Sequence, residues 1–390
     1  MSAKPFFLWY TFFFLSFSAL PGFAEVPVGG SQINAVVAGA DPTGKKACSF
    51  ELQQAANEAA TKNVPTTLYI PAGWYKLDKP LTVRTSVVMD PDARLVATAP
   101  MPVLLQIGSE GAPVKNGTVS GGILDAANLA DTGLVVAAAE NITLRDITVW
   151  DSRIAFRIGY AGRKAPYGVR TSGLVSDRRQ RMIETAKGEW VADRATSIPP
   201  YSYGLLVDNA TDGKYTLSVF KGVQTGVRTN SSGDFYSELH VWTHFQGGHG
   251  YTDVAFEDRG HDNTWIGCMA DSVAKAGFLL VGDRTNIIGS RIYNYGPKEG
   301  DQFKSPTQAV AFELAHLDMK VSILGATIHT GNPAFPIKGT LRVPGGNPDR
   351  APNLTVTGIF NDSVTYPYSG NTVISPEDHN LLNGMRYENR

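Results

Sequence analysis

The chain has 390 residues, which is enough for one large domain or two ordinary ones. Its 35 Lys and Arg residues balance 36 Asp and Glu residues, which argues against nucleic acid as a partner because phosphate binding usually shows as an excess of basic residues. The 40 glycines and 23 prolines, set among many Val, Ile and Thr runs, favour β structure.

The first 24 residues predict a secretory signal peptide. Lys4 supplies the positive start, residues 6–20 form an apolar run of suitable length, and Ala24 offers a small residue for cleavage. A single membrane anchor is the alternative, but the run is short for a bilayer span and Pro21 closes it. We therefore expect a secreted or periplasmic protein, with no membrane contact after cleavage and one domain over residues 25–390.

The folded part is expected to begin with a cap. The stretch GADPTG at residues 39–44 precedes a helix expected over Ser49–Thr61, and a strand containing PAGWYKL ends at residue 77. The first coil of a solenoid exposes an apolar end that needs a cover. The apolar face of this helix is suited to that role, and its members are Phe50, Leu52, Ala55, Ala56 and Ala59.

Together these segments resemble the N-terminal segment of the pectate-lyase-like superfamily of right-handed parallel β-helix proteins. That superfamily includes the family named pectate lyase 3 or glycoside-hydrolase-28-related. The close similarity covers residues 39–77. It implies the fold more than the chemistry, because lyases, hydrolases and phage tailspikes share this capping device.

Short β runs recur after the cap with a period of about two dozen residues, which is typical of a solenoid. The runs cover residues 140–152, 213–223, 234–245, 261–272, 284–296 and 317–331. The chain has few of the two-residue hairpin turns of a sandwich and almost none of the helices of a βαβ fold. The sequence therefore predicts an all-β, single-stranded right-handed parallel β-helix with an N-terminal capping helix. A generic all-β chain is the alternative.

Aligning the runs on apolar residues assigns each side chain to the inside or the outside of the coil. The anchors of this alignment are Val219, Val241, Cys268 and Ile292. The inward side chains are then expected to be Leu239, Val241, Ile288, Ser290, Ile292, Ile323, Ala326 and Ile328. A slip of one residue within a coil would reverse the face.

The same alignment predicts outward columns of side chains along one groove. The first column reads Thr148, His240, Gly267, Arg291 and Thr327. The second reads Trp150, Trp242, Met269, Tyr293 and His329, and the turn beyond it holds Ser152, His244, Asp271 and Tyr295. Aromatic rings with polar edges suit sugars, so His240, Trp242, Tyr295 and Trp150 are the expected substrate-binding residues. The expected catalytic residues are His244, Asp271, Arg291 and Tyr293.

Two reactions can be built from this set. In a lyase acting on a uronate, Arg291 would bind the carboxylate, His244 would take the C5 proton, and Tyr293 or Tyr295 would donate to the leaving oxygen. A hydrolase needs two carboxyl groups, and Asp271 is the first candidate. Its partner would be Asp262, Glu238, Glu257 or Asp258. We expect a polysaccharide partner and favour the lyase, with a non-catalytic glycan-binding or structural protein as the alternative of another class.

Residues 160–202 interrupt the repeat with eight Lys and Arg residues against four Asp and Glu residues. This segment is interpreted as an insertion, either a solvated excursion or a basic wall that attracts an acidic polymer. Residues 332–390 are expected to form an irregular C-terminal cap and tail. The stretch EDRGHDNTW at residues 257–265 is expected to form a tight corner with internal ion pairs, and a groove-edge carboxylate pair is the alternative.

The two cysteines, Cys48 and Cys268, lie far apart and their spacing suggests no metal site. Two buried free thiols are expected, with one long-range disulfide as the alternative. Neither a metal nor another cofactor is expected. A homotrimer is left open.

Overall fold

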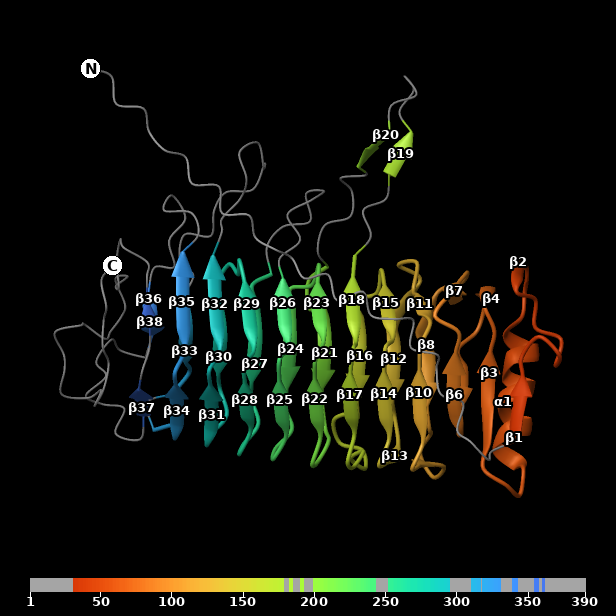
Figure 1. Cartoon of the computed structure of the whole chain (residues 1–390), viewed down its shortest axis with the longest axis horizontal. Helices are drawn as coiled ribbons and strands as arrows, with labels where there is room; N and C mark the ends of the chain where they lie inside the picture. The colour runs from red at the N-terminus through yellow and green to blue at the C-terminus, as the bar shows by residue number, and fades with distance from the viewer. Residues whose placement is uncertain are drawn as a thin grey trace, which may run out of the picture.

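The computed structural model describes residues 31–178, 182–184, 190–192, 199–242, 252–294, 310–316, 318–330, 339–342, 354–357 and 360–361. Their strands form three long parallel sheets, which we name A, B and C. Within the described ranges, ten coils each contribute a strand to A, then to B, then to C, whereas the first and last coils contribute only to A and B. Successive coils stack along one axis (Figure 1). This architecture confirms the predicted right-handed parallel β-helix.

Within each sheet, the strands are arranged in the order in which they occur along the chain. Sheet A contains β1 (Ser31–Asn34), β3 (Thr66–Ile70), β6 (Ser86–Met89), β10 (Thr118–Ser120), β14 (Thr143–Arg145), β17 (Arg170–Ser172), β22 (Lys214–Thr216), β25 (Phe235–Ser237), β28 (Thr264–Ile266), β31 (Thr285–Ile288), β34 (Val321–Leu324) and β37 (Leu354–Thr357). Sheet B contains β2 (Thr43–Ala47), β4 (Gly73–Leu77), β7 (Ala93–Ala97), β11 (Ile123–Asp125), β15 (Thr148–Trp150), β18 (Val175–Asp177), β23 (Val219–Lys221), β26 (His240–Trp242), β29 (Met269–Asp271), β32 (Arg291–Asn294), β35 (Thr327–Thr330) and β38 (Phe360–Asn361). Sheet C contains β5 (Leu81–Val83), β8 (Met101–Ile107), β12 (Ala130–Val136), β16 (Ile154–Ile158), β21 (Tyr203–Val207), β24 (Thr225–Thr229), β27 (Val254–Asp258), β30 (Ala276–Leu280), β33 (Val310–Leu314) and β36 (Gly339–Arg342).

Two short pairs lie outside these sheets. Strands β9 (Val114–Lys115) and β13 (Ala139–Glu140) pair in parallel, and β19 (Met182–Glu184) and β20 (Trp190–Ala192) form an antiparallel hairpin that projects from the stack after β18 (Figure 1).

The corner between sheets A and B has a fixed construction from β10 to β35. Each such corner has two residues. The first has a positive φ, and these residues are Gly121, Asp146, Gly173, Leu217, Glu238, Gly267, Gly289 and Gly325. The second is buried, and these residues are Gly122, Ile147, Leu174, Ser218, Leu239, Cys268, Ser290 and Ala326. The left-handed residue turns the chain while its N–H continues the hydrogen-bond ladder, as in Gly267 N–H to Ile288 O at 2.8 Å.

This corner corrects one inward assignment. Ile288 is exposed, and the neighbouring Ile287 is buried in its place. The strict alternation of a strand stops at the left-handed residue Gly289. Counting alternate residues backward from Ser290 through this corner therefore selects the wrong isoleucine.

Helix α1 (Ser49–Thr61) covers the N-terminal end of the stack as expected (Figure 1). It buries Leu52, Ala55, Ala56 and Ala59. Phe50 was assigned to the same face, and this is wrong, because its side chain is 75 % exposed. Gln53 fixes the helix to the first strand of sheet C: its amide accepts from Thr82 N–H at 2.9 Å and donates to Thr82 O at 2.8 Å.

The two ends of the capping segment pack against each other. Trp74 N–H donates to Pro42 O at 2.7 Å. Gly73 has a φ of +143° and a Cβ there would approach Pro42 to 2.7 Å, so only glycine fits. The PTG and PAGW stretches therefore pack directly against each other.

Asp41 holds the turn that precedes this contact. Its carboxylate accepts from Thr43 Oγ1 at 2.6 Å and from the N–H groups of Thr43, Lys45 and Lys46 at 2.9, 3.1 and 2.9 Å. These bonds, with that of the Thr43 hydroxyl first, lower the pKa of Asp41 from 3.8 to about 2.

Asp41→Ala should therefore lower the urea midpoint of unfolding at neutral pH. Because the folded-state pKa is depressed, this stability is present above pH 3.8 and is lost as the pH falls towards about 2. The gap in midpoint between the wild type and the variant should close over that interval in a pH series of urea titrations. A gap that stays constant down to the lower limit would contradict this role.

Three further expectations have outcomes here. Cys48 and Cys268 are buried free thiols, as expected. The interpretation of residues 160–202 as one insertion is wrong for its first part, since β17 and β18 are strands of sheets A and B. In the expected tail, β36, β37 and β38 continue the three sheets.

The signal-peptide prediction concerns residues outside the described ranges. The sole helix among the described residues, α1, has 13 residues, which falls short of the length of a membrane span.

Candidate functional site

The outer face of sheet B carries the predicted columns. Its first outer column runs through Val219, His240, Met269, Arg291 and Thr327 in successive coils. Its second outer column runs through Trp150 and Asp177, then Lys221, Trp242, Asp271, Tyr293 and His329. The strands are in register, so side chains of one column are neighbours about 4.8 Å apart.

The predicted alignment is wrong in two coils. The anchor Val219 lies in the outer column, and its neighbour Phe220 is the inward partner of Val241. The coil of Cys268 is displaced by two residues. Met269 lies beside His240 instead of Trp242, and Asp271 lies beside Trp242 instead of in the turn. The cause is Cys268, which was used as a strand anchor but is the buried second residue of the A–B corner. A slip of two residues preserves the face, so Asp271 still points outward and lies closer to the aromatic residues than expected.

Asp271 lies between two aromatic residues of the second column. Its Cα partners are Trp242 in the preceding coil and Tyr293 in the following coil. Its side chain is half-buried, and this desolvation raises the pKa of its carboxyl above the ordinary value. The Ser272 hydroxyl donates to Asp271 Oδ1 at 2.7 Å and opposes part of that shift. The carboxyl therefore keeps its proton to a higher pH than an exposed aspartate does.

His240 is neutral at physiological pH. Burial, and then the charge of Lys221, lower its pKa from 6.5 to about 4. Its ring stacks beside that of Trp242 with the centroids 5.9 Å apart and the planes 5° from parallel. Its Nε2 atom is buried and has no hydrogen-bond partner among the described residues. His240 can therefore accept or donate one hydrogen bond but does not present a positive charge.

Arg291 and Tyr293 share the outer face of β32. Arg291 is exposed, and Tyr293 is half-buried. The Tyr293 ring meets the His329 ring edge to face at a centroid distance of 5.5 Å. The structure thus brings together Asp271, Arg291 and Tyr293 with Trp242 and His240. His244 and Tyr295 lie outside the described residues.

Trp150 lies on the predicted face but apart from this group. Three coil steps, roughly 14 Å, separate it from Trp242. The Arg94 guanidinium lies 5.0 Å from the Trp150 ring centroid and 4.4 Å from that of Trp74. Arg94 is ion-paired with the buried carboxylate of Asp125. Trp150 therefore belongs to a second, already paired cluster.

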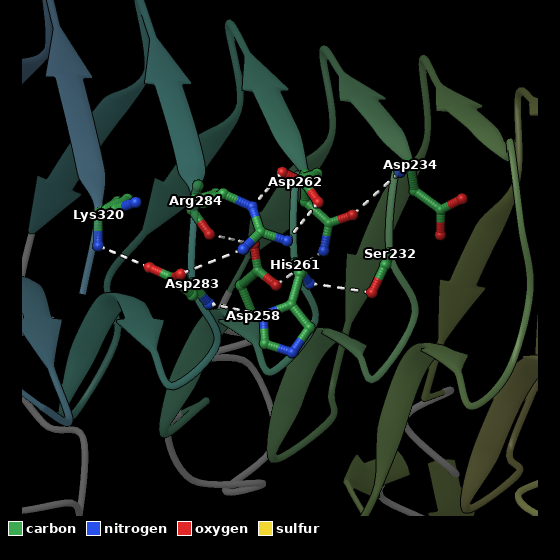
Figure 2. Close-up of polar contacts among 10 residues, drawn as sticks. Ser232, Asp234, Asp258, His261, Asp262, Asp283, Arg284 and Lys320 are labelled. Atoms are coloured by element: carbon green, nitrogen blue, oxygen red, sulfur yellow. Dashed lines mark hydrogen bonds and ion pairs between the residues drawn. The ribbon is translucent and has the colours of Figure 1, made fainter. Parts of the chain in front are cut away.

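The carboxylates proposed as partners of Asp271 in a hydrolase do not share its face. Asp258 points into the core and is fully buried, Glu257 lies on the outside of sheet C, and Glu238 is at the A–B corner. Asp262 lies at the corner between sheets C and A, where it pairs with Arg284 (Figure 2). The prediction of a carboxylate pair at the edge of the groove is therefore wrong. The other prediction, a corner with internal ion pairs, is confirmed by the 2.5 Å contact between Arg259 Nε and Glu257 Oε1.

Asp258 holds this corner together from the inside. Its carboxylate accepts from Trp265 Nε1 at 2.9 Å, Thr285 Oγ1 at 3.0 Å, Asn263 Nδ2 at 2.9 Å and Gly260 N–H at 3.0 Å. Trp265 in turn stacks on Tyr236 at a centroid distance of 4.0 Å.

A polar network on the outer face of sheet C was not predicted from the sequence. Arg228 Nη1 donates to the Tyr203 hydroxyl at 2.9 Å, and Arg228 Nε lies 3.7 Å from Glu257 Oε2. Glu257 and Tyr203 are 6 % and 8 % exposed. The available signals were Arg228 in the run TGVRT and the two acidic residues at the end of VAFED. They do not reveal which side chains meet across coils.

No group of three or more His, Cys, Asp or Glu side chains in the described part of the chain is arranged to hold a metal ion.

No protein-family model and no curated protein sequence matches this chain. Solved structures of pectin-lyase-like parallel β-helix proteins match it over most of its length at low identity. The catalytic domain of a GH87 α-1,3-glucanase in complex with tetrasaccharides has a TM-score of 0.59 and 12% identity, covering 93% of this chain and 69% of that chain. The tailspike protein of E. coli bacteriophage HK620, in complex with a pentasaccharide, has a TM-score of 0.56 and 11% identity, covering 85% of this chain and 66% of that chain. The Streptococcus pneumoniae surface protein and adhesin PfbA has a TM-score of 0.53 and 15% identity, covering 92% and 91%. This likeness establishes the fold, and the activity must be argued from the residues.

Proposed function

We propose that this chain is an extracellular protein that binds an acidic polysaccharide on the outer face of sheet B and cleaves it by β-elimination. The observation that carries the proposal is the desolvated carboxyl of Asp271 between Trp242 and Tyr293, with Arg291 on the adjacent strand. Proteins of the same fold solved with a tetrasaccharide and a pentasaccharide support a glycan as the ligand.

The spacing of the aromatic residues supports binding of a sugar ring above Asp271. The Lys221 ammonium lies over one face of the Trp242 ring at 4.8 Å, so the other face is turned towards the coil of Asp271. Two coil steps separate Trp242 from Tyr293, roughly 10 Å. A sugar ring with a van der Waals contact on each side needs about 8 Å of that space.

The charges around Asp271 suit elimination at a uronate. Arg291 binds the sugar carboxylate, whose negative charge would otherwise oppose removal of the C5 proton. His244, the base predicted from the sequence, takes that proton. The C–H electrons form the C4–C5 double bond, the C4–O4 bond breaks, and the departing O4 takes its proton from Asp271. Tyr293 orients that oxygen from the next coil.

A glycoside hydrolase is less well supported by this face. Its two carboxyl groups must be about 5 to 9.5 Å apart. The nearest other carboxylate of the second column is Asp177, three coils from Asp271 and roughly 14 Å away. A non-catalytic glycan-binding protein is the remaining alternative, and it is distinguished by binding without any new product.

Arg291→Ala should reduce the rate of cleavage of a polyuronate about 100- to 1,000-fold, because the carboxylate loses its charge partner in the transition state. The measurement is the ultraviolet absorbance of the unsaturated sugar end that elimination creates. Arg170→Ala, which removes an exposed arginine of sheet A, is the matched control and should keep the full rate.

Three other outcomes of these assays would contradict the proposed elimination at sheet B. New reducing ends without that absorbance would show hydrolysis. Full activity in Arg291→Ala together with loss of activity in Tyr203→Phe would move the reaction to the polar network of sheet C. Binding of the polymer without either product would make the protein a glycan-binding module.

A further inference from the structure

A polar groove lies on another side of the rod, where the C–A corners meet the outer face of sheet A. It is an open groove with a volume of about 300 Å³. Its polar lining comes from successive coils and comprises Asp262, Arg284, Asn286, Lys320, Ser322 and Thr355. Figure 2 shows Asp262, Arg284 and Lys320 gathered there with Asp283.

An ion pair lies in this groove. Arg284 donates from Nε and Nη2 to the two carboxylate oxygens of Asp262 at 2.5 and 2.7 Å. The main-chain N–H of Lys320 donates to Asp283 Oδ1 at 2.7 Å, which fixes the next coil against this pair. The pairing raises the pKa of Arg284 and lowers that of Asp262, so both stay charged at neutral pH.

Several polar groups remain available around the ion pair. The Lys320 ammonium, the Asn286 amide and the Ser322 hydroxyl make no side-chain hydrogen bond with any described residue. The guanidinium of Arg284 still has N–H donors to offer, and the carboxylate of Asp262 has free lone pairs. The groove therefore presents donors and acceptors side by side.

This mixture selects one class of ligand. A small anion such as phosphate would satisfy the donors but leave the Asp262 carboxylate without one. An apolar ligand would find only Val321, which is buried. Adjacent hydroxyl groups can donate to Asp262 while they accept from Arg284 and Asn286. Lys320 adds a positive charge at one end of the groove.

We infer that the groove is a second glycan-binding site, which holds one sugar residue of an acidic polysaccharide through its hydroxyls and places its carboxylate against Lys320. This inference rests on the proposed function for the choice of an acidic glycan. A polymer held on two sides of the rod would gain avidity without further contacts at sheet B.

The test is calorimetric titration of the full chain with a galacturonate tetrasaccharide. The wild type should show two binding events. Asn286→Trp should fill the groove, and Lys320→Met should remove its free charge, so each should weaken one event about 10- to 100-fold. Thr143→Trp, in the same column of sheet A as Asn286 but five coils away, is the matched control and should keep both events.

Trp242→Ala separates this inference from the proposed function, because it should weaken only the other event. Asn286→Trp and Lys320→Met with two unchanged events would overturn the groove as a glycan site, whatever happens at sheet B. If Asn286→Trp loses an event while Trp242→Ala changes nothing, the groove stands and the sheet B site fails. A wild type without any binding would overturn both.

Discussion

Replacing Asp258 with alanine should lower the free energy of unfolding by about 3 to 5 kcal/mol, because it leaves several buried donors without an acceptor. The donors are the indole of Trp265, the hydroxyl of Thr285, the amide of Asn263 and the N–H of Gly260, and they come from two coils. The loss should appear as a lower urea midpoint with an unchanged slope.

The neighbouring Asp262→Ala is the matched control for that experiment. Asp262 also accepts two hydrogen bonds, but from an exposed arginine, and exposed ion pairs contribute little to stability. Equal midpoints for the two variants would show that Asp258 is not the anchor of the corner. A reduced slope for Asp258→Ala would instead indicate that the coils no longer unfold together.

Asp271→Asn should reduce cleavage about 100- to 10,000-fold while leaving the protein folded, because the amide keeps the shape but removes the proton donor. The wild-type rate should fall as the pH rises through the raised pKa of Asp271, since only the protonated carboxyl can donate. The residual rate of the variant should lack that fall. Full activity in Asp271→Asn would remove Asp271 from the mechanism.

The direction in which Asp271→Asn changes the stability can also be predicted. The pKa of Asp271 is raised in the folded state, so its favourable contribution is lost as the pH rises through that folded value. Above that folded value the ionised carboxyl destabilises the native state, so there the neutral asparagine should unfold at an equal or higher urea concentration. A lower midpoint would mean that Asp271 has a structural role.

The fold could be predicted because its signals are local and repeated. The Gly73 and Pro42 contact requires a particular pair of stretches near the start of the chain, and both are visible in the sequence. Apolar alternation then defines each strand. The alternation fails at the corners. The left-handed residue Gly289 interrupts it, so the pattern does not tell which isoleucine points inward, and Cys268 is buried although it lies in a corner and not in a strand.

The candidate site was less predictable because it depends on which residues meet between coils. Asp271 was identified as outward, but its position beside Trp242 depends on the register of two strands 29 residues apart (271 minus 242). The desolvation that raises its pKa depends on both neighbouring coils. The Tyr203 and Arg228 contact on sheet C depends likewise on strands from different coils, so no single stretch of sequence shows it.

The two-residue A–B corners and the long connections after sheet B lie at different edges of the rod. From β10 to β35 every A–B corner has the same length, whereas the chain between β18 and β21, or between β26 and β27, is far longer. The rim next to Trp242, Asp271 and Tyr293 thus accepts extra residues, whereas the A–B corners do not. A longer connection at this rim could change which polymer the protein binds, while the spacing of the stacked coils stays the same.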